Sequence, residues 1–323
     1  MRAVVYDRYG PADVLHIAEV PRPAPKPDEV LIKVHAAAVT RADGETRSAN
    51  RRSGRVVSTI SRLVFGFRTP RQPILGKDFS GEVAEAGSEV AQFKVGDQVF
   101  GSTGFRFGAH AEYLTVKAAR YVATMPKGAS FVEAAAVTDG GIYALTPLRG
   151  AHIKKGQKVL VYGASGAIGT SGVQLARHFG AEVTAVCQTR HFDLMKSLGA
   201  DHLIDYTLED FTKNGELYDV IFDAVGKHSF RRCEGSLKQG GTYLPTDKFE
   251  NVVLALRPLP RDGKTVKFLV AAQRDDVEFL KGLIEAGEFR PVIDRTYAFD
   301  DVVEAARYVD TEQKVGNVIL NIA

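Results

Sequence analysis

Hydrophobic positions follow two different patterns along the chain. Up to about residue 125, short apolar runs alternate with prolines and glycines, which is typical of β-strands joined by tight turns. From Ser130 onward, apolar runs of strand length alternate with segments of helical periodicity. The first pattern predicts strands at residues 3–6, 29–39, 78–86, 98–100 and 111–116.

The second pattern predicts a doubly wound parallel sheet, an α/β fold. Six parallel strands with covering helices complete such a sheet. A helix at 302–308 and a strand at 316–321 are expected to return to the first part of the chain. We therefore predict a mostly-β domain at 1–125, completed by about 291–323, and a dinucleotide-binding domain at 126–290. The six strands are predicted at residues 159–161, 182–186, 202–205, 219–224, 242–244 and 266–270.

The turn after the first of these six strands is rich in glycine. Gly163, Gly166 and Gly169 let the backbone approach a phosphate with no Cβ in the way. The helix predicted from Thr170 to about Phe179 points its N-terminus at the anion. With alanine in first place, the spacing matches the G-x-G-x-x-G pattern between a strand and a helix. The turn predicts a Rossmann site for a pyrophosphate, the alternative being a tight turn that binds nothing. Its predicted contacts are Ala164, Ser165, Gly166, Ala167, Ile168 and Gly169.

The choice of dinucleotide depends on the residues after the second strand, where an NAD-selective site usually places an acid against the ribose 2′-hydroxyl. This chain has Gln188, Thr189 and Arg190 there and no acid. Arg190 and Thr189 can hold a 2′-phosphate through charge-assisted hydrogen bonds. We therefore predict NADP, the alternative being that Arg190 caps a solvated loop.

Length and composition agree with two domains, because 323 residues with 45% hydrophobic content can bury a sizeable core. A net charge of +3 is too small to indicate a nucleic-acid partner. The largest excess of one sign, between residues 41 and 71, is interpreted as a solvated lid or loop. Its arginines are Arg41, Arg47, Arg51, Arg52, Arg55, Arg62, Arg68 and Arg71.

Targeting signals and disulfides are not expected. No apolar stretch approaches the roughly 18 residues needed to cross a bilayer, so a soluble, unprocessed protein without a membrane partner is predicted. The two cysteines, Cys187 and Cys233, cannot form a disulfide framework and are interpreted as buried fillers. A reducing cytoplasm is the expected location.

Six further segments spread over nearly the whole chain carry a specific combination of residues. They are PILGKDFSGEV (73–83), FKVGDQVF (93–100), GAHAEY (108–113), LGADHLIDY (198–206), DVIFDAVG (219–226) and KVGNV (314–318). Together with the glycine turn, they resemble the medium-chain dehydrogenase/reductase superfamily, specifically its zinc-independent quinone oxidoreductase branch. The resemblance implies a GroES-like β domain beside the Rossmann domain, with cofactor and substrate in a cleft between them, and a homodimer.

The resemblance also implies roles for individual residues. Thr40 and Asp43 stand where relatives often have Asn and Asp at the cleft. Tyr206 and Lys314 are implied at the adenosine phosphate end, the alternatives being a packing tyrosine and a solvated charge. The remaining predicted cofactor contacts, at the ends of later strands, are Val225 and Leu244.

The zinc ligands of related alcohol dehydrogenases are missing from this chain. A catalytic zinc needs three protein ligands, normally Cys, His or Glu. The segment VTRAD (39–43) stands where the family has Cys, and GKD (76–78) replaces Gly-His-Glu. No cysteine precedes residue 187, so the four-cysteine structural lobe is absent too. No metal is predicted.

Two departures from the family affect the catalytic residues, and the first is that relatives commonly have an aromatic residue soon after Asp43, where this chain has GET (44–46). Many relatives have Thr where this chain has Tyr143, which is interpreted either as a nicotinamide-side or substrate contact or as a core aromatic. Lys77, in the lost zinc motif, is expected either to pair with Asp78 or to serve in proton delivery.

Without a metal, the chemistry that is easiest to support is hydride transfer from NADPH to an acceptor that is already electrophilic, such as a quinone or an α,β-unsaturated carbonyl. We predict a zinc-independent oxidoreductase of this kind. Two alternatives stay open: a zinc-free dehydrogenase of a particular alcohol or acyl substrate, and a low-turnover NADPH-binding sensor or structural protein.

Overall fold

The computed structural model describes residues 1–49, 58–59, 62–63, 65–246, 262–268 and 274–323. It forms two compact units. The first comprises Met1–Asp139, Gln273–Glu285 and Ile293–Ala323, and the second comprises Gly140–Ala272 and Ala286–Val292. The first unit thus extends beyond the predicted 1–125.

Helix α3 (Phe131–Ala135) explains why the first unit extends so far. Phe131 stacks on His35, with ring centroids 4.1 Å apart, and its carbonyl oxygen accepts a hydrogen bond from Ser80 Oγ. These contacts hold α3 against strands of the first unit.

The first unit contains a seven-stranded sheet in the order β14-β15-β3-β4-β5-β7, with β6 also pairing with β3. β15 is antiparallel to β3, with Val318 opposite Val39, so the last strand of the chain pairs with a strand of the first part. A separate antiparallel pair joins β1 and β2. The strands are β1 (Arg2–Val5), β2 (His16–Glu19), β3 (Glu29–Val39), β4 (Asp78–Ala86), β5 (Gln98–Ser102), β6 (Tyr113–Lys117), β7 (Val122–Thr124), β14 (Ile293–Ala298) and β15 (Asn317–Asn321).

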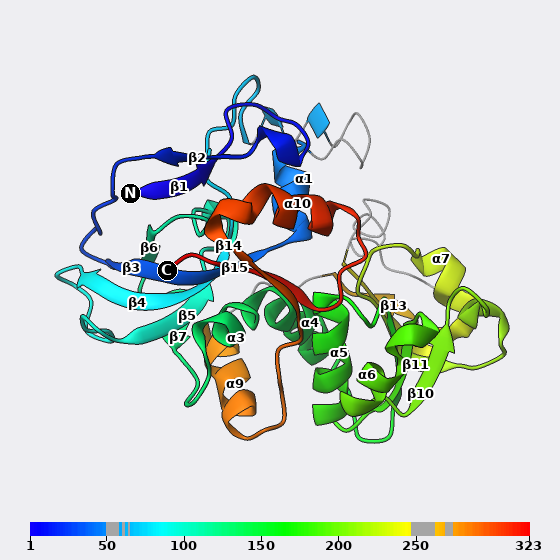
Figure 1. Cartoon of the computed structure of the whole chain (residues 1–323). Coiled ribbons are helices and arrows are strands. Elements are labelled where there is room, and N and C mark those ends of the chain that lie inside the picture. The colour runs from blue at the N-terminus through cyan, green and yellow to red at the C-terminus, as the bar shows by residue number, and fades with distance from the viewer. Residues whose placement is uncertain (50–57, 60–61, 64, 247–261, 269–273) are drawn as a thin grey trace. The chain divides into compact units, whose positions relative to one another are not determined.

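The first unit also contains the helices α1 (Arg41–Arg47), α9 (Arg274–Glu285) and α10 (Val302–Asp310). α10 runs alongside β14 and β15 (Figure 1). Its Ala305, Ala306 and Val309 are buried in a core that includes Val318 and Leu320 of β15.

The second unit is the predicted doubly wound parallel sheet. Its strand order is β10-β9-β8-β11-β12-β13, and every pairing is parallel. Numbered from β8, this is the order 3-2-1-4-5-6 of dinucleotide-binding folds, in which ligands bind where the order reverses, here between β8 and β11. The fold class is confirmed. The strands are β8 (Lys158–Tyr162), β9 (Glu182–Cys187), β10 (His202–Asp205), β11 (Tyr218–Asp223), β12 (Leu237–Pro245) and β13 (Thr265–Val266).

The helices of the second unit include α5 (Ala167–His178), α6 (Phe192–Ser197), α7 (Phe230–Cys233) and most of α4 (Thr138–Gly150). α5 begins at Ala167, not at the predicted Thr170. β13 ends at Val266, and residues 269–270 of the predicted strand lie outside the described residues.

The interpretation of residues 41–71 as a solvated lid or loop is wrong for two of its arginines. Arg47, in α1, is 2% exposed and pairs with Asp310 of α10 at 2.5 Å. Arg62 lies over the Tyr9 ring at 4.8 Å. Both are part of packing within the first unit. Arg51, Arg52 and Arg55 lie outside the described residues.

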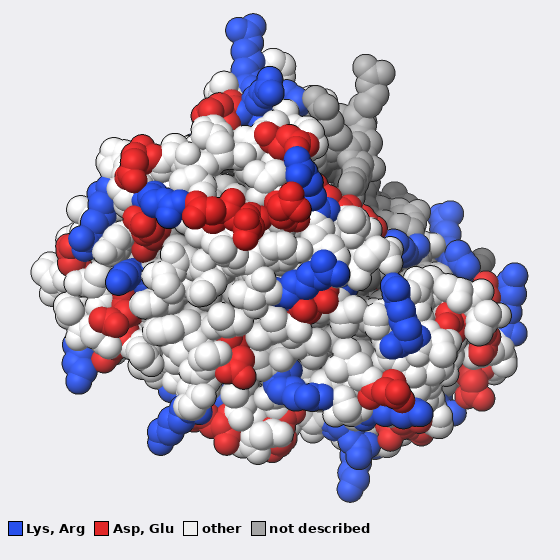
Figure 2. All heavy atoms as spheres, in the orientation of Figure 1, with Lys and Arg blue, Asp and Glu red and all other residues white. Residues whose placement is uncertain are grey.

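Basic and acidic side chains are interspersed on the face of the molecule drawn in Figure 2. This distribution accords with the small net charge of +3.

Candidate active site

The three glycines of the turn after β8, Gly163, Gly166 and Gly169, have different structural roles. Gly163 has φ +74°, and a Cβ there would lie 2.5 Å from Val225 Cγ1. A Cβ on Gly169 would lie 2.2 Å from the Gly163 carbonyl oxygen, so Gly169 permits close packing of α5 on the turn. A Cβ on Gly166 would meet only the Gly163 oxygen, at 3.7 Å. Gly166 therefore leaves space that a ligand can fill.

Gly166 is also the N-cap of α5. It has no side chain to cap the helix, so the N–H groups of the first turn are available to an anion. The turn is anchored because Gly163 N and Ala164 N both donate to the Val186 carbonyl oxygen of β9 at 3.0 Å. Ala164 and Ala167 are buried, whereas Ser165 and Ile168 are partly exposed. This geometry fits a dinucleotide pyrophosphate.

The loop after β9 carries Gln188, Thr189 and Arg190. Thr189 and Arg190 are exposed and Gln188 is half-buried. Arg190 Nε donates to His191 Nε2 at 3.2 Å, which places two nitrogen-bearing side chains together. The backbone N–H of Thr189 donates to Asp205 Oδ2 at 2.7 Å, and its hydroxyl donates to the same oxygen.

Asp205 is a functional candidate that the sequence reasoning missed. It ends β10, the strand beside β9, whereas the predicted nucleotide contacts Gln188, Thr189 and Arg190 follow β9 itself. Its hydrogen bonds with Thr189 and Thr207 hold the pKa of Asp205 far below its usual range. A search for acids on both strands at this edge of the sheet would have found it.

The other predicted cofactor residues of the second unit lie on neighbouring strand ends. Tyr206 follows Asp205, is 46% exposed and tilts towards Tyr162, with ring centroids 6.3 Å apart. Val225 lies against the glycine turn, and its N–H donates to the buried Asp223 at 3.3 Å. Leu244, on β12, is fully buried. Tyr206 and Val225 are thus at the surface of this edge, whereas Leu244 is inside the core.

Tyr143 lies on α4, one turn after Gly140. A Cβ on Gly140 would lie 2.2 Å from the Ala167 carbonyl oxygen, so α4 passes close to the first turn of α5. Residues three apart share a helix face, and Tyr143 is half-buried. Its helix thus lies next to the candidate pyrophosphate site within the second unit.

In the first unit, Thr40 and Asp43 form the cap of α1. Asp43 Oδ2 accepts hydrogen bonds from Thr40 N at 2.7 Å and Thr40 Oγ1 at 2.8 Å. Asp43 Oδ1 accepts from Gly76 N at 2.9 Å. Both side chains are buried, and Asp43 thereby ties the start of α1 to the loop before β4.

Lys77 lies in a buried charge cluster with Asp78 and Asp139. Its Nζ is 3.3 Å from Asp139 Oδ1 and 3.9 Å from Asp78 Oδ2. The pKa of Asp78 is raised to about 7, mainly by burial; the Lys77 charge opposes this shift and the Asp139 charge adds to it. Lys77 was expected either to pair with Asp78 or to serve in proton delivery, and the structure contains the ion pair with Asp78.

Lys314 belongs to the same unit. Its Nζ donates to the Gly316 carbonyl oxygen at 2.6 Å. Burial lowers the pKa of Lys314, while the Asp139 and Asp294 carboxylates oppose the shift. Lys314 is partly buried.

Zinc has no fitting set of ligands among the described residues, which contain no group of three or more His, Cys, Asp or Glu able to hold a metal. Lys77, in the position of the family's histidine, is an ammonium engaged by carboxylates. His110 packs on Gly76 and turns Nε2 towards the Ala38 carbonyl oxygen at 2.9 Å.

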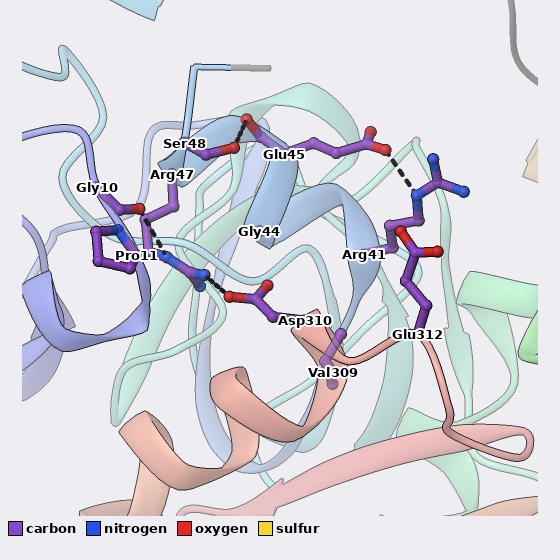
Figure 3. Close-up of a pocket in the computed structure, with 10 residues that line it drawn as sticks. All are labelled: Gly10, Pro11, Arg41, Gly44, Glu45, Arg47, Ser48, Val309, Asp310 and Glu312. Carbon is purple, nitrogen blue, oxygen red and sulfur yellow. Dashed lines mark hydrogen bonds and ion pairs between the residues drawn. The ribbon is translucent and has the colours of Figure 1, made fainter. Parts of the chain in front are cut away.

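A pocket of about 240 Å³ lies beside α1 (Figure 3). Arg47 points to Asp310, and Arg41 to Glu45. Thr40 and Asp43 do not line it, and its ion pairs connect α1 internally and to α10.

Comparison with known proteins agrees with this architecture. Residues 26–127 match the alcohol dehydrogenase GroES-like domain, and residues 198–320 match the zinc-binding dehydrogenase family. The chain is 35% identical to the 2-methylene-furan-3-one reductase of Solanum lycopersicum, over 99% of this chain and 79% of that protein. It is 33% identical to an NADPH-dependent alkenal/one oxidoreductase of Arabidopsis thaliana, again over 99% and 79%. The quinone oxidoreductase structure from Coxiella burnetii is 28% identical, with a TM-score of 0.88 covering 100% of this chain and 99% of that one.

The chain therefore belongs to the medium-chain dehydrogenase/reductase superfamily, in its quinone oxidoreductase-like branch, and is an oxidoreductase. Among the described helices, none is both long and apolar enough to cross a membrane.

Proposed function

We propose that this protein is a zinc-independent, NADPH-dependent reductase of quinones or α,β-unsaturated carbonyls. The observation that carries the proposal is the pairing, in one unit, of an open Gly166 at a helix N-terminus with an exposed Arg190 and an anchored Thr189. The first suits a pyrophosphate, and the second suits a 2′-phosphate.

The residues of the second unit would hold the cofactor as follows. The first-turn N–H groups of α5 would bind the pyrophosphate, and Thr189, Arg190 and Tyr206 the adenosine phosphate. Bound NADPH would supply a hydride, a reaction for which an electrophilic acceptor needs no metal. The names of the tomato and Arabidopsis relatives support acceptors with a conjugated carbonyl.

We propose catalytic-site roles for four residues. Tyr143 would border the reacting end of the cofactor, because its helix adjoins the first turn of α5. Lys77 would contribute positive charge. Thr40 and Asp43 would fix the loop that carries Lys77, because Asp43 accepts a hydrogen bond from Gly76 N. Lys314 stays a predicted contact of the adenosine phosphate and is not one of these four residues.

Cofactor choice can be tested with Arg190→Ala. The wild-type protein should use NADPH at least about tenfold more efficiently than NADH, the effect of one charged hydrogen bond to phosphate. Arg190→Ala should lose most of that preference with little change for NADH. Equal wild-type efficiency with both cofactors would contradict the assignment.

Substrate class can be tested by following NADPH oxidation with a panel of quinones and alkenals, and NADP⁺ reduction with a panel of alcohols. Reduction of quinones or alkenals, unaffected by a chelator, is expected. Turnover of alcohols alone would favour a dehydrogenase, and binding without turnover would favour a sensor or structural protein. Loss of activity in chelator with recovery in zinc would refute zinc independence.

We also propose a homodimer in a reducing, cytoplasmic compartment. The family resemblance supports the dimer, and the buried thiols of Cys187 and Cys233 accord with that compartment. Light scattering of the purified chain should give twice the monomer mass of 35.1 kDa.

A further inference from the structure

The Asp205 carboxylate connects two loops at one edge of the second-unit sheet. On one side, Oδ2 accepts from the backbone N–H of Thr189, at 2.7 Å, and from its hydroxyl. On the other side, Oδ1 accepts from Thr207 N at 2.8 Å and Thr207 Oγ1 at 2.7 Å. One side chain therefore fixes both the loop after β9 and the turn after β10.

These two loops carry the residues proposed for the 2′-phosphate. Gln188 and Arg190 flank Thr189, and Tyr206 lies between Asp205 and Thr207. A displacement of either loop would move these side chains relative to one another. Asp205 is therefore placed to set their spacing without touching the ligand itself.

The same hydrogen bonds argue against a direct contact between Asp205 and the ribose of the cofactor. A carboxylate offers about four lone-pair sites, and four donors already occupy those of Asp205. A ribose 2′-hydroxyl would have to displace one of these donors. This separates Asp205 from the acid that reads the ribose in NAD-selective sites.

We propose that Asp205 is a positioning residue for cofactor selectivity, holding Thr189, Arg190 and Tyr206 in the arrangement that accepts a 2′-phosphate. This inference rests on the proposed use of NADPH. The negative charge of Asp205 also repels a phosphate. Replacing Asp205 would therefore weaken NADPH binding through the loss of positioning and strengthen it through the loss of repulsion.

The test is steady-state kinetics of Asp205→Ala with both cofactors. We expect the KM for NADPH to rise about tenfold, the effect of losing one well-placed charged hydrogen bond. The KM for NADH and both kcat values should change by less than about twofold, because the pyrophosphate site is untouched. Asp205→Asn keeps one acceptor oxygen and should show a smaller rise.

Asp210→Ala is the matched control. Asp210 Oδ1 accepts from Thr212 N at 3.1 Å and Thr212 Oγ1 at 2.7 Å, the same local pattern, but its other oxygen bonds Arg232. Asp210→Ala should leave the ratio of the KM for NADPH to the KM for NADH unchanged. If Asp205→Ala does not fold, Asp205→Asn carries the test by the same ratio.

Three outcomes overturn the inference. A fall in the KM for NADPH would show that repulsion dominates, and a selective rise in the KM for NADH would show that Asp205 reads the ribose. An unchanged ratio of the KM values for NADPH and NADH would show that the two loops keep their arrangement without Asp205. A wild-type protein that prefers NADH refutes the proposed cofactor and the inference together, whereas the three outcomes in an NADPH-preferring protein refute the inference alone.

Discussion

Gly166 is the residue on which the candidate pyrophosphate site depends most directly. Gly166→Val should abolish NADPH binding, because the added side chain would occupy the space beside the first turn of α5. The fold should survive, with a loss of stability below about 1 kcal/mol, since the new Cβ meets only one atom, at 3.7 Å. NADPH fluorescence titration measures the binding.

Gly235→Val provides the control for this variant. A Cβ at Gly235 meets nothing within 4 Å, and the residue lies away from the glycine turn in sequence. Its NADPH affinity should equal that of the wild type. Near-normal affinity in a folded Gly166→Val protein would place the cofactor elsewhere.

Asp78 should make stability depend on pH. Its pKa is raised to about 7 from the ordinary 3.8, mainly by burial, so between these values the folded chain keeps a proton that the unfolded chain releases. The free energy of unfolding therefore falls as the pH rises from about 4 to 7, by up to about 1.4 kcal/mol per pH unit.

Asp78→Asn removes this titration and should flatten the decline. Urea unfolding at several pH values, compared between the two proteins, measures the difference. The prediction fails if the difference in unfolding free energy between wild type and variant is constant across this range.

At the scale of elements, α5 depends on Gly169 for its packing against the turn. Gly169→Ala would bring a Cβ to 2.2 Å from the Gly163 oxygen and 2.6 Å from Ala164 Cα. We expect a loss of about 1–3 kcal/mol from overpacking. Thermal or urea denaturation measures it, and Gly235→Ala, which adds its Cβ in open space, should change stability by less than about 0.5 kcal/mol. Equal effects in both variants would contradict the close packing.

Sequence patterns predicted elements well where burial is strong. The bounds of β3 and β4, whose residues are mostly buried, match the predicted 29–39 and 78–86. β10 also matches the predicted 202–205, although only Ile204 in it is buried. β2 and β14 were missed because they are largely exposed and show no continuous apolar run. The predicted start of α5 at Thr170 lies within its first turn, since the helix begins at Ala167.

The candidate site could be predicted from the sequence only where the backbone itself forms it. Glycines at fixed spacing act through the backbone, so their positions can be interpreted from the sequence alone. The cap formed by Thr40 and Asp43, and the Asp205 bridge between loops, depend on hydrogen bonds set by the fold. Their hydrogen-bond partners could not be read from spacing.

At the scale of the whole molecule, the two units contribute different chemistry. The second unit has the open helix N-terminus and the Arg190 loop, which suit a dinucleotide. The first has the buried Lys77 cluster and the capped α1. The proposed reaction requires both, since the cofactor needs the second unit and the assigned roles of Lys77, Thr40 and Asp43 need the first.

The central claim is hydride transfer from NADPH to a conjugated acceptor. Turnover of an α,β-unsaturated ketone with NADPH that carries deuterium at both hydrogen positions of its donor carbon tests it most directly, with the product analysed by mass spectrometry and NMR. The account predicts one deuterium, bound to the carbon β to the carbonyl, with no added metal. A product without deuterium, or label transferred to the carbonyl carbon of an aldehyde or ketone, would contradict it.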